Sequence, residues 1–223
     1  MVITVRMLFV FFISVVHLNM MAQNPLAITG QVKCQGDGVA NVVVTNGFDC
    51  VLTDASGKYT IPYHRDARFV YVTTPAGYLP QRDGSLPLFY QHIIEGTFIY
   101  DFSLVKNPRN DDRHLFLVQA DVQLGKGEDV AAYAEYLKDM REFINRHSEY
   151  DLFVLDCGDI VGNALSLFPS YKQTSDVLDV PMYRVIGNHD MEYGVRSYEH
   201  SYKTYEECFG PIYYSFNRGK AHY

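Results

Sequence analysis

The chain has 223 residues and a mass of 25.5 kDa, with 48% hydrophobic and 20% charged residues. These proportions exclude a disordered chain, a collagen and a coiled coil. Acidic residues outnumber basic ones by 26 to 19, giving a formal net charge of −7. A non-specific nucleic-acid binder needs a basic face for phosphates, so no nucleic-acid partner is expected. A phosphorylated ligand is still compatible, because a bound metal can supply positive charge locally.

Residues 1–22 have the pattern of a signal peptide. Arg6 precedes the apolar run 7–16, which is too short to span a bilayer, and Ala22 offers a small residue for cleavage before Gln23. A buried N-terminal strand is the alternative. We therefore expect an exported protein, whether periplasmic, secreted or at the cell surface, with no transmembrane helix and no lipid anchor at the cleavage site.

The four cysteines are Cys34, Cys50, Cys157 and Cys208. None forms a Cys-x-x-Cys pair, so a structural zinc site is not indicated. Export would permit a disulfide between Cys34 and Cys50, and two unpaired buried thiols are an equal alternative. Cys157 ends an apolar strand and is expected to be a small core residue.

The part of the chain from 23 to 105 predicts an all-β domain. Short strands and turn signals follow one another there, with strands at 28–32, 39–45, 58–62 and 69–73 and a turn at 54–57. This spacing favours a small β-sandwich. The polar, proline-containing stretch 106–112 predicts a linker.

From residue 113 onward, strands alternate with helices. Apolar strands are expected at 114–120, 151–155 and 182–186, a helix at 128–146 and a second helical or irregular stretch at 166–178. The first of these strands is almost continuously apolar, which predicts burial on both faces. The helix carries one apolar stripe, made of Val130, Tyr133, Leu137, Met140 and Ile144. The alternation predicts an α/β layered domain with a largely parallel sheet.

Polar side chains follow each apolar strand. They are Asp121 and Gln123 after the first, Asp159 and Asn163 after the second, and Asn188, His189 and Asp190 after the third. Parallel strands bring their carboxyl ends to one edge of a sheet, where ligands bind. Carboxylates gathered there repel one another unless a cation balances them. Oxygen and imidazole donors suit divalent Mn, Fe or Zn, and two such ions can bind a phosphate and generate hydroxide.

Taken singly, these residues have simpler explanations. An Asp at a strand end is more often a helix cap or a turn former, and a Gly-Asp pair is mostly a turn. The metal-site hypothesis therefore depends on the order in which these residues occur along the chain. Gly158 and Gly187 strengthen it, because glycine lets the backbone turn tightly beside a metal.

The order of Asp121, Gly158-Asp159 and 187–190 resembles the calcineurin-like metallophosphoesterases, and the segment 209–216 is similar to the one that follows in exported members. Region 28–79 resembles the transthyretin-like or carboxypeptidase-regulatory-like β domain, through its marks at 38–42, 53–59 and 75–78. One exported bacterial subgroup combines the two. The resemblance implies a multidomain chain, with an all-β sandwich followed by an α/β/β/α layered phosphoesterase domain.

The resemblance also implies two divalent metal ions and a role for each motif residue. Asp159 would bridge the two metals, Asp121 would bind the first and Asn188 the second. His189 would contact the phosphate and protonate the leaving alkoxide. Asp190 would orient His189 and hold its charged form.

Two departures from the family pattern stand out. Gln123 occupies a position where the family has His, and an amide oxygen is a weaker donor for a transition metal, so Gln123 is a doubtful ligand. Asn163 is expected only to line the substrate site. Family members also carry a later Gly-His-x-His element, which this chain does not contain. We therefore expect 113–223 to be the N-terminal part of the phosphoesterase domain, with about half of its ligands.

The leading functional hypothesis is metal-dependent hydrolysis of a phosphate mono- or diester in a phosphorylated small molecule or a glycan-linked substrate. The alternative is a non-catalytic exported protein with a β module and a degenerate phosphoesterase domain. A carbohydrate-binding sandwich is a third hypothesis, resting on tyrosines that are more often core residues: Tyr59, Tyr63, Tyr71, Tyr78, Tyr90 and Tyr100.

Overall fold

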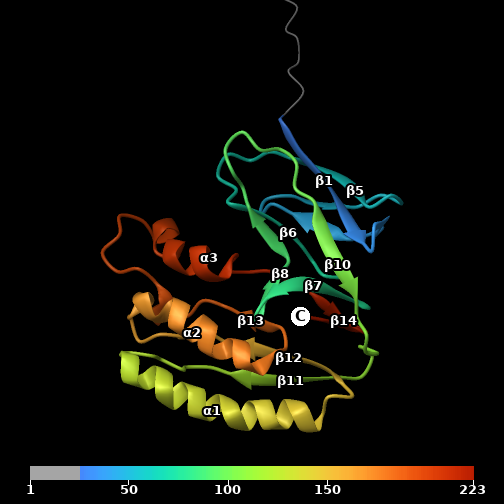
Figure 1. Cartoon of the computed structure of the whole chain (residues 1–223). Coiled ribbons are helices and arrows are strands. Elements are labelled where there is room, and N and C mark those ends of the chain that lie inside the picture. Colours follow the sequence, from blue (N-terminus) through green and yellow to red (C-terminus); the bar gives the residue numbers. More distant parts are fainter. Residues whose placement is uncertain (1–25) are drawn as a thin grey trace, which may run out of the picture.

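A computed structural model describes residues 26–223 of the chain (Figure 1). The predicted signal peptide and its cleavage site lie outside the described residues. Among the described helices, none is long and apolar enough to cross a membrane.

All the regular elements described before residue 107 are strands. They are β1 (Ala27–Cys34), β2 (Asp37–Gly38), β3 (Val43–Thr45), β4 (Cys50–Leu52), β5 (Lys58–Pro62), β6 (Phe69–Val72), β7 (Tyr78–Asp83), β8 (Leu86–Leu88), β9 (Tyr90–His92) and β10 (Phe102–Lys106). One sheet has the order β2-β1-β10-β7-β8, with β5 also paired to β1, and the other has the order β4-β3-β6-β9. Strands β1 and β10 pair in parallel, and the other neighbours are antiparallel.

Local turn chemistry explains where these strands begin and end. The apolar run 39–45 forms a strand only in its last three residues, because Asn41 takes a left-handed φ of 58° that interrupts the extended backbone. The predicted turn before β5 is present. There the Asp54 carboxylate accepts hydrogen bonds from the backbone N–H groups of Ser56 and Lys58, at 2.8 and 2.9 Å.

The rest of the chain alternates strands with helices. Its elements are β11 (His114–Gln119), α1 (Gly127–Arg146), β12 (Asp151–Asp156), α2 (Phe168–Ser175), β13 (Met182–Arg184), α3 (Lys203–Phe209), β14 (Asn217–Arg218) and β15 (Ala221–His222), with 3₁₀ turns at 165–167, 176–178, 188–190 and 198–200. Strands β11, β12 and β13 form a parallel sheet, as the sequence predicts, and lie in that order. Strands β14 and β15 form a separate antiparallel hairpin.

Helix α1 buries the stripe that its sequence predicts. Tyr133, Leu137, Met140 and Ile144 are buried, and the half-buried Val130 packs against the same cluster. The Asp129 carboxylate receives hydrogen bonds from the N–H groups of Gly125 and Lys126, at 2.9 and 3.0 Å, which fixes the start of the helix.

Strand β12 lies between two hydrophobic clusters. Val154 faces a cluster made with α1, α2 and α3, whereas Phe153 faces a cluster that includes the cores of both N-terminal sheets. Both side chains are fully buried. In Figure 1, α1 lies on one side of the parallel sheet and the N-terminal strands lie on the other. The N-terminal β region and the α/β region therefore share one continuous core across this strand.

The prediction that the first apolar strand is buried on both faces is wrong. Strand β11 pairs only with β12, so it lies at an edge of its sheet. Leu115 and Leu117 pack against the helical cluster, but Phe116 and Val118 on the other face are 44% and 54% exposed. Alternate side chains of a strand point to opposite faces, so covering one face leaves the other open.

The structure also bears on the expectations for the cysteines and for the N-terminal tyrosines. All four cysteines lie in the described residues and each is free, so Cys34 and Cys50 are not bridged. Cys157 is exposed, which contradicts the expected core position, because it lies just beyond the last residue of β12. The six tyrosines named for a carbohydrate site all belong to the shared core or pack against it, which confirms the core alternative.

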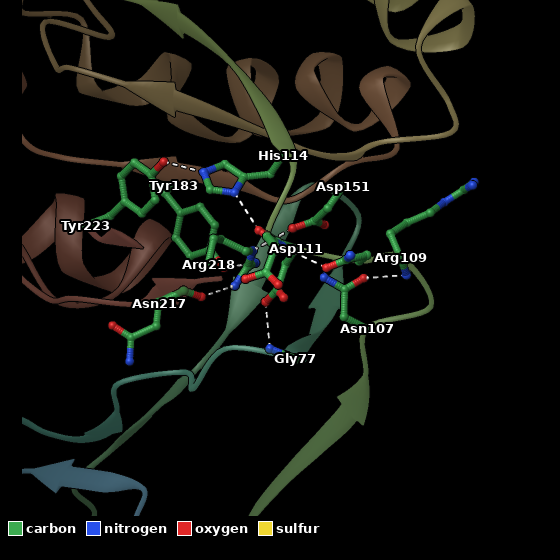
Figure 2. A network of polar contacts seen from close by, with 12 residues as sticks. Gly77, Asn107, Arg109, Asp111, His114, Asp151, Tyr183, Asn217, Arg218 and Tyr223 are labelled. Atoms are coloured by element: carbon green, nitrogen blue, oxygen red, sulfur yellow. Dashed lines mark hydrogen bonds and ion pairs between the residues drawn. The ribbon is translucent and has the colours of Figure 1, made fainter. Parts of the chain in front are cut away.

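A polar network ties the C-terminal hairpin to the parallel sheet (Figure 2). Arg218 is fully buried and forms an ion pair with Asp151 at the start of β12, with 3.1 Å between Nε and Oδ2. It also donates a hydrogen bond to the Tyr183 hydroxyl at 2.9 Å.

Nearby, the Asp111 carboxylate accepts a hydrogen bond from the Gly77 N–H at 2.6 Å, so the predicted linker packs against the N-terminal strands. Where the domain boundaries fall stays a prediction.

We predict that Arg218→Met lowers the free energy of unfolding by about 3–5 kcal/mol, because it leaves the Asp151 carboxylate buried without its partner. Urea unfolding followed by circular dichroism measures the loss. The control is Lys138→Met, which breaks an exposed ion pair to Glu135 and should cost under about 1 kcal/mol. Equal losses in the two variants would contradict a stabilising role for the buried pair.

Candidate functional site

The loops that follow β11 and β12 run side by side at the carboxyl edge of the parallel sheet. The Asp121 N–H donates to the Gly158 carbonyl at 3.1 Å, and the Gln123 N–H donates to the Asp159 carbonyl at 2.9 Å. The next residue continues the ladder, with the Leu124 N–H donating to the Ile160 carbonyl. These backbone bonds hold the first two predicted motifs next to each other.

The candidate site has an unusual backbone. Seven non-glycine residues in the described chain have positive φ, and four of them are site residues: Asp121 at 55°, Gln123 at 49°, Asp159 at 52° and Asn163 at 66°. Side chains rarely adopt this left-handed region, although Asp and Asn tolerate it best. Each such residue costs of order 1–3 kcal/mol unless its surroundings enforce it, and such residues cluster at functional sites.

Two glycines allow the loops after β12 and β13 to touch. A Cβ on Gly187 would lie 2.1 Å from both the backbone N and the Oδ1 atom of Asp159. A Cβ on Gly158, where φ is 91°, would lie 2.6 Å from the Gly187 N. No larger residue fits at either position without moving the backbone, so the two glycines bring the second and third motifs into contact.

His189 is held from two directions. Its backbone N–H donates to Asp159 Oδ1 at 3.0 Å, and its ring Nδ1 lies 2.9 Å from Asn163 Oδ1. Asn163 was expected only to line the site, yet its side chain is the one that contacts the imidazole. The ring itself is half-buried, and Nε2 is free of hydrogen bonds within the described residues.

Asp190, which we expected to orient His189, bonds to the backbone of two loops. Its carboxylate accepts hydrogen bonds from the backbone N–H groups of Val161, at 3.0 Å, and Gly187, at 2.9 Å. The side chain is fully buried, and this burial raises the pKa of Asp190 although the backbone donors act in the opposite direction. Asp190 therefore ties the loop after β12 to the loop after β13, and the ring contact belongs to Asn163.

Gln123 contacts a predicted metal ligand. Its Nε2 donates to Asp121 Oδ1 at 3.3 Å. This contact uses the amide nitrogen, and it positions the carboxylate of Asp121.

Sequence reasoning missed a buried carboxylate beneath the site. Asp156 accepts a hydrogen bond from the Gly158 N–H at 3.2 Å, and its other oxygen accepts bonds from Gln119 Nε2, at 2.7 Å, and the Tyr171 hydroxyl. Burial raises the pKa of Asp156. The only signal in the sequence was an acid at the end of an apolar strand, three residues before Asp159.

The available donors fit part of a divalent metal site. Asp121, Asp159 and Asn188 place carboxylate and amide oxygens on three adjoining loops, which are donors that divalent ions accept. Within residues 26–223, no three His, Cys, Asp or Glu side chains gather into a group that could hold a metal ion. The described donors therefore match a divalent metal centre in chemistry.

Two hollows flank these loops. One, of about 590 Å³, is lined by the loop after β11 and the first turns of α1, including Asp121 and Tyr136. The other, of about 420 Å³, is lined by Asn188 and the loop 191–201, including Tyr193. The Tyr193 hydroxyl donates to the Asn188 carbonyl at 3.1 Å. Space for a ligand is thus present on both sides of the three motifs.

Comparison with known families now identifies this arrangement. The family model for the N terminal of calcineurin-like phosphoesterase matches residues 26–107, and the model for calcineurin-like phosphoesterase matches residues 114–222. The chain therefore belongs to the calcineurin-like phosphoesterase family.

Other comparisons add little. No curated protein matches the chain. Among solved structures, it is similar to the purple acid phosphatase PPD1 isolated from yellow lupin (Lupinus luteus) seeds, with 13% identity and a TM-score of 0.33. That similarity covers 81% of this chain and 37% of the lupin chain.

We predict that Gly187→Ala lowers the free energy of unfolding by about 1–3 kcal/mol, because the added methyl group overlaps Asp159. Urea unfolding measures the change. The control is Gly127→Ala at the start of α1, where a Cβ meets nothing within 4 Å. In the control, alanine should be neutral or should stabilise by up to about 1 kcal/mol. An unchanged stability in Gly187→Ala would mean that the close approach of the two loops is not required.

Proposed function

We propose that this chain carries the site of a metal-dependent phosphoesterase. The reaction is hydrolysis of a phosphate mono- or diester, in a phosphorylated small molecule or a glycan-linked substrate. The observation that carries the proposal is the meeting of three strand-end loops, where Asp121 and Asp159 take left-handed backbone conformations and His189 bonds to Asp159. Backbone strain of this kind persists where the surrounding structure enforces it for function.

Asp121, Asp159 and Asn188 are the proposed ligands of two divalent ions, taken from Mn, Fe and Zn. When bound, such ions supply a hydroxide nucleophile near neutral pH and neutralise charge on the phosphoryl oxygens. Asp159 would be a ligand of both ions. Gln123 acts through Asp121, since its amide nitrogen faces that carboxylate.

His189 is the proposed proton donor to the leaving oxygen. With a proton on Nδ1, the ring can donate to Asn163 Oδ1 and present Nε2 to the substrate. When both ring nitrogens are protonated, the Nε2 proton can pass to the leaving alkoxide. Asn163 is thereby a positioning residue that fixes the plane and tautomer of the imidazole, and Asp190 fixes the backbone on either side of it.

Finer features of the architecture also belong to this proposal. We infer that the region 23–105 is a transthyretin-like β-sandwich and that 113–223 is the N-terminal part of an α/β/β/α phosphoesterase domain. The ten strands β1–β10 and the parallel sheet β11-β12-β13 support this division. The pattern of residues 1–22 supports export to the periplasm, the cell surface or the medium.

A non-catalytic exported binding protein is the rival function. The observation that favours it is that no group of three potential ligands is formed within residues 26–223, together with Gln123 in place of a histidine. Hydrolysis assays and metal analysis on the same variants separate the two functions.

We predict that Asp159→Asn abolishes hydrolysis and metal binding together, because it removes the bridging charge. His189→Ala should lower turnover by about 10²–10⁴-fold, the usual contribution of general acid catalysis, while metal binding is retained. The assay uses p-nitrophenyl phosphate and bis-p-nitrophenyl phosphate with added Mn²⁺, and metal content is measured by elemental mass spectrometry.

The matched control is Asp139→Asn, which neutralises an exposed carboxylate on α1 and should leave both quantities unchanged. Wild-type turnover in Asp159→Asn or in His189→Ala would refute the role assigned to that residue. If the unsubstituted chain hydrolyses neither ester, the non-catalytic function is favoured.

A further inference from the structure

A second cleft lies away from the three motifs, where the N-terminal strands meet the segments on either side of α3. It has a volume of about 480 Å³, in the range of small-ligand sites. We name it the junction cleft, and the lining residues used in the argument are Phe48, Arg68, Glu199, Tyr202, Glu206 and Tyr213. Clefts between structural units are common places for ligands to bind.

Two exposed aromatic rings border the junction cleft. Phe48 and Tyr213 are 56% and 60% exposed, although they are large apolar side chains. Phe48 stacks on the His64 ring with 3.7 Å between centroids, and the Tyr213 hydroxyl donates to the Gly47 carbonyl at 3.3 Å. Both rings are thus held in place while their surfaces stay open to solvent, which lowers the entropy cost of binding a ligand against them.

The turn that carries Phe48 is also fixed. The side-chain oxygen of Asn46, Oδ1, accepts hydrogen bonds from the N–H groups of Phe48, at 3.0 Å, and Asp49, at 2.8 Å. The Asn46 amide nitrogen donates to the Pro62 carbonyl at 2.8 Å. The first two bonds stabilise the turn between β3 and β4, and the bond to Pro62 anchors that turn to the end of β5.

A fixed guanidinium group lies in the same cleft. Arg68 donates to the buried Glu206 carboxylate at 2.8 Å, and its guanidinium carbon lies 4.6 Å from the centroid of the Tyr202 ring. The Arg68 side chain is still 42% exposed, so it can offer N–H donors to a ligand. The cleft therefore combines aromatic faces, hydrogen-bond donors and carboxylate acceptors.

The charges in the cleft decide which ligand class fits. Arg68 is paired with Glu206 and Arg65 with Asp66, so the Glu199 carboxylate adds a negative charge that disfavours a phosphate or another anion. An ammonium ligand would lie against the Arg68 guanidinium and would be repelled by its positive charge. A neutral polyol avoids both conflicts, because its hydroxyl groups donate to carboxylates and accept from a guanidinium, while its C–H faces pack on the electron-rich faces of aromatic rings.

We propose that the junction cleft binds a neutral oligosaccharide, with Phe48 and Tyr213 stacking on sugar rings and Arg68 and Glu199 bonding to hydroxyl groups. The segment 191–202 lines the junction cleft through Glu199 and Tyr202. It also lines the hollow beside the three motifs, through residues that include Tyr193. The proposal goes beyond the proposed phosphoesterase function and does not depend on it, since binding here needs no metal.

The test is isothermal titration of the purified chain, in the presence of EDTA, with maltohexaose, cellohexaose, xylohexaose and mannohexaose. At least one should bind with a Kd below about 1 mM. Phe48→Ala and Tyr213→Ala should each weaken that binding by about tenfold or more, because each removes a stacking surface. Circular dichroism verifies that both variants remain folded.

Phe116→Ala is the matched control, since Phe116 is an exposed aromatic on β11 that does not line the junction cleft, and it should leave the affinity unchanged. The absence of saturable binding to all four oligosaccharides would overturn the proposal. So would binding that Phe48→Ala and Tyr213→Ala leave intact. Choline is titrated in parallel, and a tighter choline affinity that is lost in Tyr213→Ala would replace the oligosaccharide by a cationic ligand.

Discussion

Parallel, in-register pairing of β11, β12 and β13 is the constraint on which the candidate site depends. Because Gln119 pairs with Asp156 at the ends of β11 and β12, the loops that carry Asp121 and Asp159 leave the sheet at the same edge. The register is fixed by burial, since Phe153 and Val154 lie in clusters on opposite sides of β12. A slip of one residue would exchange the two sides and separate the loops.

Beyond the sheet, the loops adopt conformations that short-range preferences do not favour. Left-handed residues and two crowded glycines cost free energy, and carboxylates beneath the loops offset part of that cost by bonding to the backbone. Asp156 accepts from the Gly158 N–H, and Asp190 accepts from the N–H groups of Val161 and Gly187. The loops are thus positioned by buried acids, while Asp121, Asn188 and Asn163 remain exposed for chemistry.

Periodicity predicts the parts of the fold that repeat a simple pattern. The stripe of α1, the extent of β5 and the parallel direction of β11, β12 and β13 follow from spacing and alternation. Features that depend on residues far apart in the sequence cannot be predicted in this way. The open face of β11, the contact between Asn163 and His189, and the ion pair between Arg218 and Asp151 each depend on which segments meet in three dimensions. Site residues could be recognised from their order, whereas their partners could not.

The central claim is that the three strand-end motifs bind divalent metal. The most direct measurement is the metal content of the purified chain after dialysis against trace Mn, Fe and Zn, determined by elemental mass spectrometry. The account predicts metal retained by Asp121, Asp159 and Asn188, up to the two ions per chain of a two-metal phosphoesterase site. A metal content near zero would contradict it, and would mean that Asp121, Asp159 and Asn188 do not form a metal site in this chain.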